Sequence, residues 1–80
     1  MKELAIMHNI QFGVYDRDKA ALWFNVDMLG RGALLCLYPE QAIELIEKYG
    51  ITDIKNLEGA PCIVDIEDGI VRFDDLYKRG

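Results

Sequence analysis

His8 is the one histidine of this 80-residue chain, and histidine is the side chain best suited to acid–base chemistry near neutral pH. It lies in a run whose other even positions are apolar, with Ile6, Ile10 and Phe12 nearest to it. No Ser-His-Asp or Cys-His spacing places a nucleophile beside it, although catalytic groups can also meet only in the fold. We therefore interpret His8 as a half-buried structural residue on the inner face of a strand.

The two cysteines, Cys36 and Cys62, could supply thiolates for metal binding or for a nucleophilic reaction. Both lie inside apolar, strand-like runs, where an unmodified cysteine behaves as a small hydrophobic residue. A zinc site needs further ligands, and the chain has neither a C-x-x-C nor an H-x-x-x-H spacing. The sequence thus predicts two reduced, buried thiols and no metal site.

Acidic and glycine-rich segments are the remaining candidates for chemistry. The carboxylates of residues 65–68 do not fit a calcium loop, because Gly69 falls one place early for the D-x-D-x-D-G pattern. The Gly30-Arg31-Gly32 turn lacks the spacing of a phosphate loop and the helix that follows one. Turn geometry and loop solvation explain both segments. We therefore expect no enzyme activity, no metal and no cofactor.

Charge and composition restrict the partner and the compartment. Fourteen acidic and nine basic residues give a net charge of −5, which disfavours direct binding to nucleic acid. The same charge suits a partner with a basic surface, including a nucleic-acid-binding groove, while solubility alone is the simpler explanation. The apolar content of 51% supports a single packed domain over residues 1–80. No apolar run approaches ~18 residues and no signal peptide is recognisable, so we expect a cytoplasmic protein without membrane contact.

Hydrophobic periodicity predicts three strands before a helix. Over residues 4–14 the even positions form the apolar face of the first strand. A polar loop tip at 16–19 follows, and the second strand, over 20–28, also turns its even residues inward. The third strand, over 33–38, is apolar on both faces, as expected for a central strand or one covered by a partner.

One principal helix is predicted over Pro39–Tyr49. Proline fits the first helical position, and Gly50 supplies a left-handed cap at the end. Glu44 and Lys48 are four residues apart in the favourable order for an ion pair. A short helical turn that is capped by Thr52 leads into the last strands.

A β-hairpin closed by Asp68-Gly69 is the clearest local pattern. A type I′ turn needs positive φ at both central residues, and Asp-Gly is among the pairs that adopt it. Pairing across this turn sets Glu67 opposite Ile70, Ile66 opposite Val71, Asp65 opposite Arg72 and Val64 opposite Phe73.

The element order βββ-α-ββ predicts an α+β fold, a five-stranded and mainly antiparallel sheet with the helix packed on one face. The inward residues of these elements form the expected core. They are Ile6, Ile10, Phe12, Leu22, Phe24, Val26, Leu45, Ile46, Val64, Ile66, Val71 and Phe73.

Trp23 is predicted to lie on the face away from the helix, because Leu22 and Phe24 occupy the core side. There it either packs under a second layer or anchors an interface. Four further apolar residues are assigned to the same face: Met7, Tyr15, Leu35 and Leu37. Such a patch is too large to leave in water, so we expect a two-fold homodimer through this face.

Several short segments resemble small proteins carried by bacteriophages and mobile elements. They are Leu57-x-Gly59-x-Pro61-Cys62-x-Val64, Gly69-x-Val71-x-Phe73, Phe12-Gly13-Val14-Tyr15-Asp16 and Tyr49-Gly50-Ile51-Thr52-Asp53. Compact acidic proteins of that kind include anti-CRISPR and other anti-defence inhibitors. The resemblance implies an inhibitor that binds a host defence protein stoichiometrically in the bacterial cytoplasm, for example a nucleic-acid-binding nuclease.

The residues expected to bind that partner combine an acidic loop tip with an aromatic anchor: Tyr15, Asp16, Arg17, Asp18, Trp23 and Asp27. Two alternatives stay open. A sponge for a nucleotide signal would need Arg17, Arg31 or Arg72 facing an aromatic ring, and the acidic balance weighs against it. A phage accessory or structural protein without an inhibitory role is also compatible with the sequence.

Overall fold

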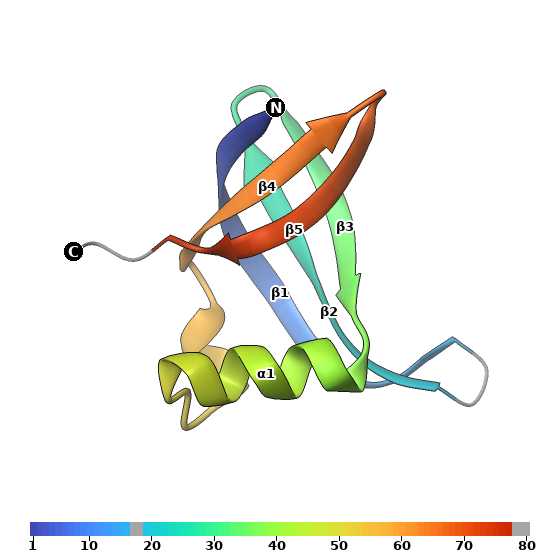
Figure 1. Ribbon diagram of the computed structural model, residues 1–80, viewed down its shortest axis with the longest axis vertical. Helices are drawn as coiled ribbons and strands as arrows, with labels where there is room; N and C mark the ends of the chain where they lie inside the picture. Colours follow the sequence, from blue (N-terminus) through green and yellow to red (C-terminus); the bar gives the residue numbers. More distant parts are fainter. Residues whose placement is uncertain (17–18, 78–80) are drawn as a thin grey trace.

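The computed structural model describes the chain apart from residues 17, 18 and 78–80, and describes Tyr15 and Asp16 by their backbone alone. Five strands, one α-helix and one 3-10 turn make up the described fold (Figure 1). Their bounds are β1 Lys2–Asp16, β2 Lys19–Met28, β3 Arg31–Leu37, α1 Pro39–Tyr49, η1 Ile54–Leu57, β4 Pro61–Glu67 and β5 Ile70–Leu76. This is the predicted βββ-α-ββ order.

The strands form one sheet in the spatial order β3-β2-β1-β4-β5, and every neighbouring pair is antiparallel. The sheet curves so strongly that the edge strands β3 and β5 contact each other, although they are not hydrogen-bonded neighbours. Helix α1 packs against β2 and β3 at the lower end of the sheet in Figure 1. The α+β fold, with five strands and one helix packed on the sheet, is confirmed.

The β4–β5 hairpin has the predicted register at all four pairs, from Glu67 opposite Ile70 to Val64 opposite Phe73. Asp68 and Gly69 have φ angles of 51° and 78°, so both central residues of the turn have positive φ. Glycine adopts such angles at the lowest cost, which explains why the chain turns at this position.

Helix α1 has the predicted bounds and ends on the predicted glycine. Gly50 has φ 60°, and the N–H groups of Gly50 and Ile51 donate to the carbonyls of Glu47 and Ile46. The cap predicted for the following turn is wrong, because Asp53 and not Thr52 caps η1. Its side chain accepts the Lys55 N–H at 3.0 Å, a bond that a carboxylate makes readily two residues along the chain.

Strand β1 changes face at Asn9, and this overturns part of the predicted core. Asn9 has φ 56°, and the register with β2 shifts between His8 and Gln11. Such a bulge offsets the period-two alternation by one residue. Met7 is therefore 0% exposed in the core, whereas Ile6 lies on the outer face and is 42% exposed.

Phe12 was also predicted in the core, but it is 52% exposed. It lies opposite Leu22 and so on the core side of the sheet. Phe12 is exposed because β4 pairs with β1 only as far as Ile6 and does not extend beside Phe12.

Most of the predicted core residues lie in or against the core, which also holds buried residues outside that prediction, among them Met7, Leu35 and Leu37. Leu22, Phe24, Val26, Leu45 and Val64 are buried, while Ile10, Ile66, Val71 and Phe73 are partly buried against them and Ile46 is half-buried. The rings of Phe24 and Phe73 meet edge to face, with centroids 5.7 Å apart and planes at 82°. This contact joins β2 to β5 across the curve of the sheet.

The apolar patch predicted on the face away from the helix is wrong in most of its members. Met7, Leu35 and Leu37 are buried in the core, and the side chain of Tyr15 lies outside the described residues. Strand β3 is an edge strand and not a central one. Trp23 alone keeps its assignment, because the residues directly opposite it, Gln11 and Cys36, share the outer face.

Candidate protein-binding surface

The structure spreads the predicted partner-binding residues along the β1–β2 hairpin. Tyr15 and Asp16 end β1, and Arg17 and Asp18 lie outside the described residues. Trp23 is in the middle of β2 and Asp27 is near the far end of that strand. At ~3.3 Å per residue these two are about 13 Å apart, so the predicted residues form a line and not one compact site.

The Trp23 side chain is half-buried against its own sheet. Its Cη2 atom lies 3.8 Å from the position that a β-carbon on Gly13 would occupy. Because Gly13 has no side chain, the indole can cover the neighbouring strand, as aromatic residues often do beside glycine in a sheet. Part of the ring remains exposed on the outer face.

His8 lies on the outer face and not on the predicted inner one, because the bulge at Asn9 reverses the alternation. Its Nε2 atom is 2.9 Å from Oδ2 of Asp27, without the alignment of a hydrogen bond. Beside them, Asn9 Nδ2 donates to Asn25 Oδ1 at 3.2 Å. The His8–Asp27 attraction is therefore electrostatic and requires a protonated imidazole.

The thiols occupy two different environments. Cys62 is fully buried in the core, and burial raises its pKa to about 11. Cys36 is half-buried on β3, opposite Trp23. Among the described residues, no group of three or more histidine, cysteine or acidic side chains is placed to hold a metal ion.

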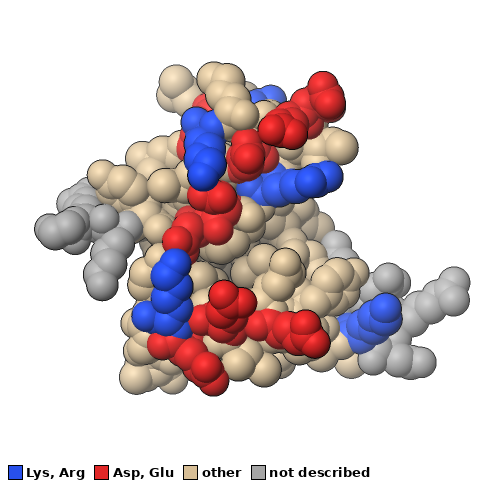
Figure 2. Space-filling model, in the orientation of Figure 1, with Lys and Arg blue, Asp and Glu red and all other residues tan. Residues whose placement is uncertain are grey.

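An acidic ridge, formed by Glu40, Glu44 and Glu47, runs along the exposed side of α1. Spacings of four and three residues place the three carboxylates on one side of the helix, while the buried Ala42 and Leu45 face the core. Within the part of the chain that the structure describes, none of the three makes an ion pair. Figure 2 shows acidic side chains in a band along this helix.

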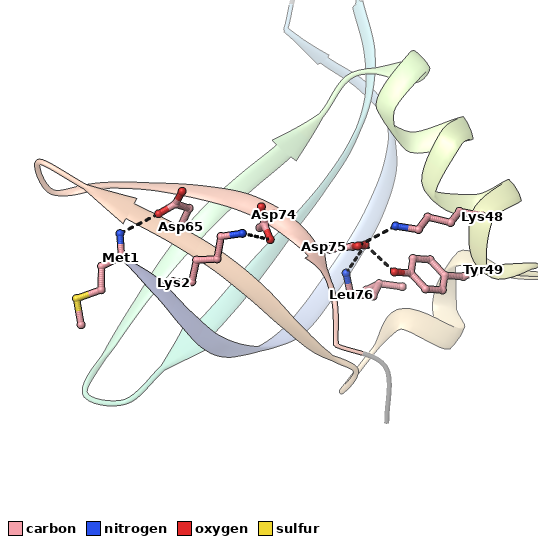
Figure 3. A network of polar contacts seen from close by, with 8 residues as sticks. All are labelled: Met1, Lys2, Lys48, Tyr49, Asp65, Asp74, Asp75 and Leu76. Carbon is pink, nitrogen blue, oxygen red and sulfur yellow. Dashed lines mark hydrogen bonds and ion pairs between the residues drawn. The ribbon is translucent and has the colours of Figure 1, made fainter. Parts of the chain in front are cut away.

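Lys48, which the sequence pairs with Glu44, reaches across to β5 instead. Its Nζ donates to Asp75 Oδ2 at 2.8 Å, and the Tyr49 hydroxyl donates to Oδ1 at 2.7 Å (Figure 3). The Leu76 N–H adds a third hydrogen bond at 2.8 Å. Lys48 and then Tyr49 hold the pKa of Asp75 below its ordinary value. The cation of α1 is thereby engaged away from the acidic ridge.

A groove separates the acidic ridge from β5. Its volume is about 200 Å³, and Leu37, Leu45 and Phe73 form its apolar part. Asp74 stands on the β5 side, where Lys2 pairs with it at 3.2 Å (Figure 3). The groove thus has an apolar floor and a predominantly acidic rim, which is suited to a basic side chain of a partner.

The described arginines that a nucleotide site would need lie among carboxylates. Arg31 Nη2 is 3.6 Å from Glu3 Oε2. Arg72 lines a hollow of about 110 Å³ together with Asp65, Glu67 and Asp68. Carboxylates repel a phosphate group, so neither arginine provides a favourable site for one.

The signal for the acidic ridge was present in the sequence, as three glutamates on one helix face. The sequence did not show that Lys48 pairs with Asp75, which lies 27 residues further along the chain, instead of with Glu44.

No α-helix in the described ranges has the length and apolar character to cross a membrane. Compared with protein-family models, curated proteins and solved structures, the chain matches none.

Proposed function

We propose that the protein is a small acidic binding protein, encoded by a phage or mobile element, that inhibits a host defence protein by stoichiometric binding. The observation that carries the proposal is the acidic ridge on α1, whose three exposed glutamates make no ion pair among the described residues. Such a surface is attracted to a basic one, and the groove by which a nuclease binds nucleic acid is basic. Occupying that groove would exclude the nucleic acid.

A binding role also agrees with the placement of the chemically capable side chains. His8 is on the outer face of the sheet and Cys62 is in the core on the other side. In this proposal Cys62 packs in the core, His8 is part of the surface, and the protein catalyses no reaction. The carboxylates around Arg31 and Arg72 weigh against the nucleotide sponge.

The test begins with phage plating on hosts that each carry one defence system, with and without the protein. The nuclease of the system that is inhibited is then purified and titrated with the protein. We expect cleavage to end at a fixed molar ratio, because each molecule occupies one binding surface. Inhibition at far lower ratios would indicate catalysis, and a panel without any inhibited system would refute the proposal.

Charge variants locate the surface. Glu44→Gln with Glu47→Gln should weaken inhibition by about tenfold or more at low salt, because two desolvated charges are lost from the contact. The control, Glu67→Gln with Asp68→Asn, removes the same number of charges at the hairpin tip and keeps a turn-forming Asn-Gly pair. Equal losses in both variants would show that only net charge matters. Trp23→Ala in the same titration tests the predicted aromatic contact.

A further inference from the structure

The β1–β2 hairpin extends beyond the rest of the sheet as a two-stranded arm. β4 pairs with β1 only over Lys2–Ile6, and β3 pairs with β2 only over Leu22–Met28. Among the described residues, therefore, no third strand lies beside the pairs Gly13–Ala21 and Val14–Ala20. Figure 1 shows the arm projecting past α1. A two-stranded ribbon is marginally stable in water unless another surface packs on it.

The helix side of this arm is apolar and exposed. Phe12 is 52% exposed and Val14 is 68% exposed, and Val14 shares its face with Ala20. Ala20 in turn lines a notch of about 590 Å³ between the arm and the start of α1. Tyr38, 45% exposed, and Pro39 form the opposite wall of the notch. Arm and notch thus share an apolar strip that runs from Val14 through Ala20 to Tyr38 and Pro39.

We propose that a second copy of this chain covers that surface, with the arm of each protomer packed in the notch of its partner. In a two-fold interface the same patch occurs on both protomers, so every contact between two different residues is formed twice. The notch carries one cation and one anion, Lys19 and Glu40, and neither makes an ion pair among the described residues. Lys19 of each protomer can therefore face Glu40 of its partner.

Charge and area both favour a copy of the chain as the occupant. Lys19 and Glu40 make the charge of the notch complementary to itself, whereas Glu44 and Glu47 further along α1 would repel each other if two copies met through the rest of the helix. Phe12, Val14 and Tyr38 together expose about 300 Å² per copy, taking an aromatic side chain as ~200 Å². That is enough for the apolar centre of an interface of about 800 Å² per partner. The interface lies on the helix side and not on the outer face that carries Trp23.

The test reverses one charge of the proposed contact in each of two variants and measures the mass of each variant, alone and mixed, by sedimentation. Wild type should sediment at twice the mass of one 9.1 kDa chain at tens of micromolar. Lys19→Glu and Glu40→Lys should each raise the dimer dissociation constant by about tenfold or more, because every dimer then contains two like-charge contacts. An equimolar mixture of the two variants should dimerise again, since both contacts in the heterodimer join opposite charges.

Matched controls separate this interface from an effect of net charge. Lys55→Glu and Glu67→Lys make the same charge changes away from the notch, and each should stay dimeric alone. Leu34→Ser, on the exposed outer face, should also stay dimeric, and circular dichroism confirms that every variant folds. A monomeric wild type overturns the proposal. So does a mixture that fails to restore the dimer, or a dimer that Lys55→Glu weakens as much as Lys19→Glu.

Discussion

At the residue scale, Asp75 gathers more polar contacts than any other single carboxylate in the network of Figure 3. It receives hydrogen bonds from Lys48, from the Tyr49 hydroxyl and from the Leu76 N–H. These bonds fasten the end of α1 to β5, two elements that are remote in the sequence. Because all three donors favour the ionised carboxylate, the pKa of Asp75 lies below its ordinary value.

This pKa predicts acid sensitivity. A carboxyl whose folded pKa is lowered stabilises the fold above its ordinary value of 3.8, and this contribution disappears as the pH falls through the lower folded value. Urea unfolding at pH 6 and at pH 2.5 should therefore show a smaller loss of stability for Asp75→Asn than for wild type. Asp68→Asn, at the exposed turn, is the control and should behave as wild type does. An unchanged acid dependence in Asp75→Asn would contradict the assignment.

At the element scale, β1 is shaped by one bulge. Asn9 adopts a left-handed φ that asparagine tolerates better than most residues. The Asn9 N–H donates to Glu58 Oε1 at 3.0 Å instead of to a neighbouring strand. In the same segment, the Gly59 N–H donates to the Met7 carbonyl, and the Met7 N–H donates to the Ala60 carbonyl. The bulge is therefore held by the segment that leads into β4.

The bulge predicts losses of stability of different size for two adjacent alanine substitutions. Met7→Ala should lower the free energy of unfolding by about 2–5 kcal/mol, because it leaves a cavity in the core. Ile6→Ala should lower the free energy of unfolding by about 1 kcal/mol or less, since Ile6 is 42% exposed and lies outside the core. Urea denaturation at one protein concentration measures both. A larger loss for Ile6→Ala would mean that β1 keeps unbroken alternation.

At the scale of the whole molecule, the sheet curls around one core. β2 and β5 meet through Phe24 and Phe73, and α1 covers the end of the curve. Cys62 on β4 lies inside this core without measurable exposure. Its thiol therefore becomes accessible only when the packing of strands and helix is lost.

Cys62 can accordingly report global unfolding. With its pKa raised to about 11, the native thiol is almost wholly protonated at pH 8 and does not react as a thiolate. In Cys36→Ser, which leaves Cys62 as the one thiol, iodoacetamide should add no label in buffer and one label in urea. Mass spectrometry of timed samples counts the labels. Labelling in buffer at the unfolded rate would place Cys62 outside the core.

Elements that depend on interactions between residues close in the sequence could be predicted from the sequence. Asp68-Gly69 dictates its own turn and therefore the register of β4 and β5. Pro39 and Gly50 bound α1 in the same way, because proline and glycine act on the local backbone. The acidic ridge follows from helix spacing alone.

Features that depend on remote partners were decided only by the tertiary structure. The inward face of β1 depends on a bulge whose N–H is satisfied by Glu58, 49 residues away, so period-two counting placed Ile6 in the core and Met7 outside it. Among the residues that the structure describes, the glutamates of the acidic ridge stay unpaired because Lys48 binds Asp75 and not Glu44. The exposure of Phe12 depends on where β4 stops pairing with β1. In each case the local pattern allows two arrangements, and a hydrogen bond or strand contact across the fold selects one.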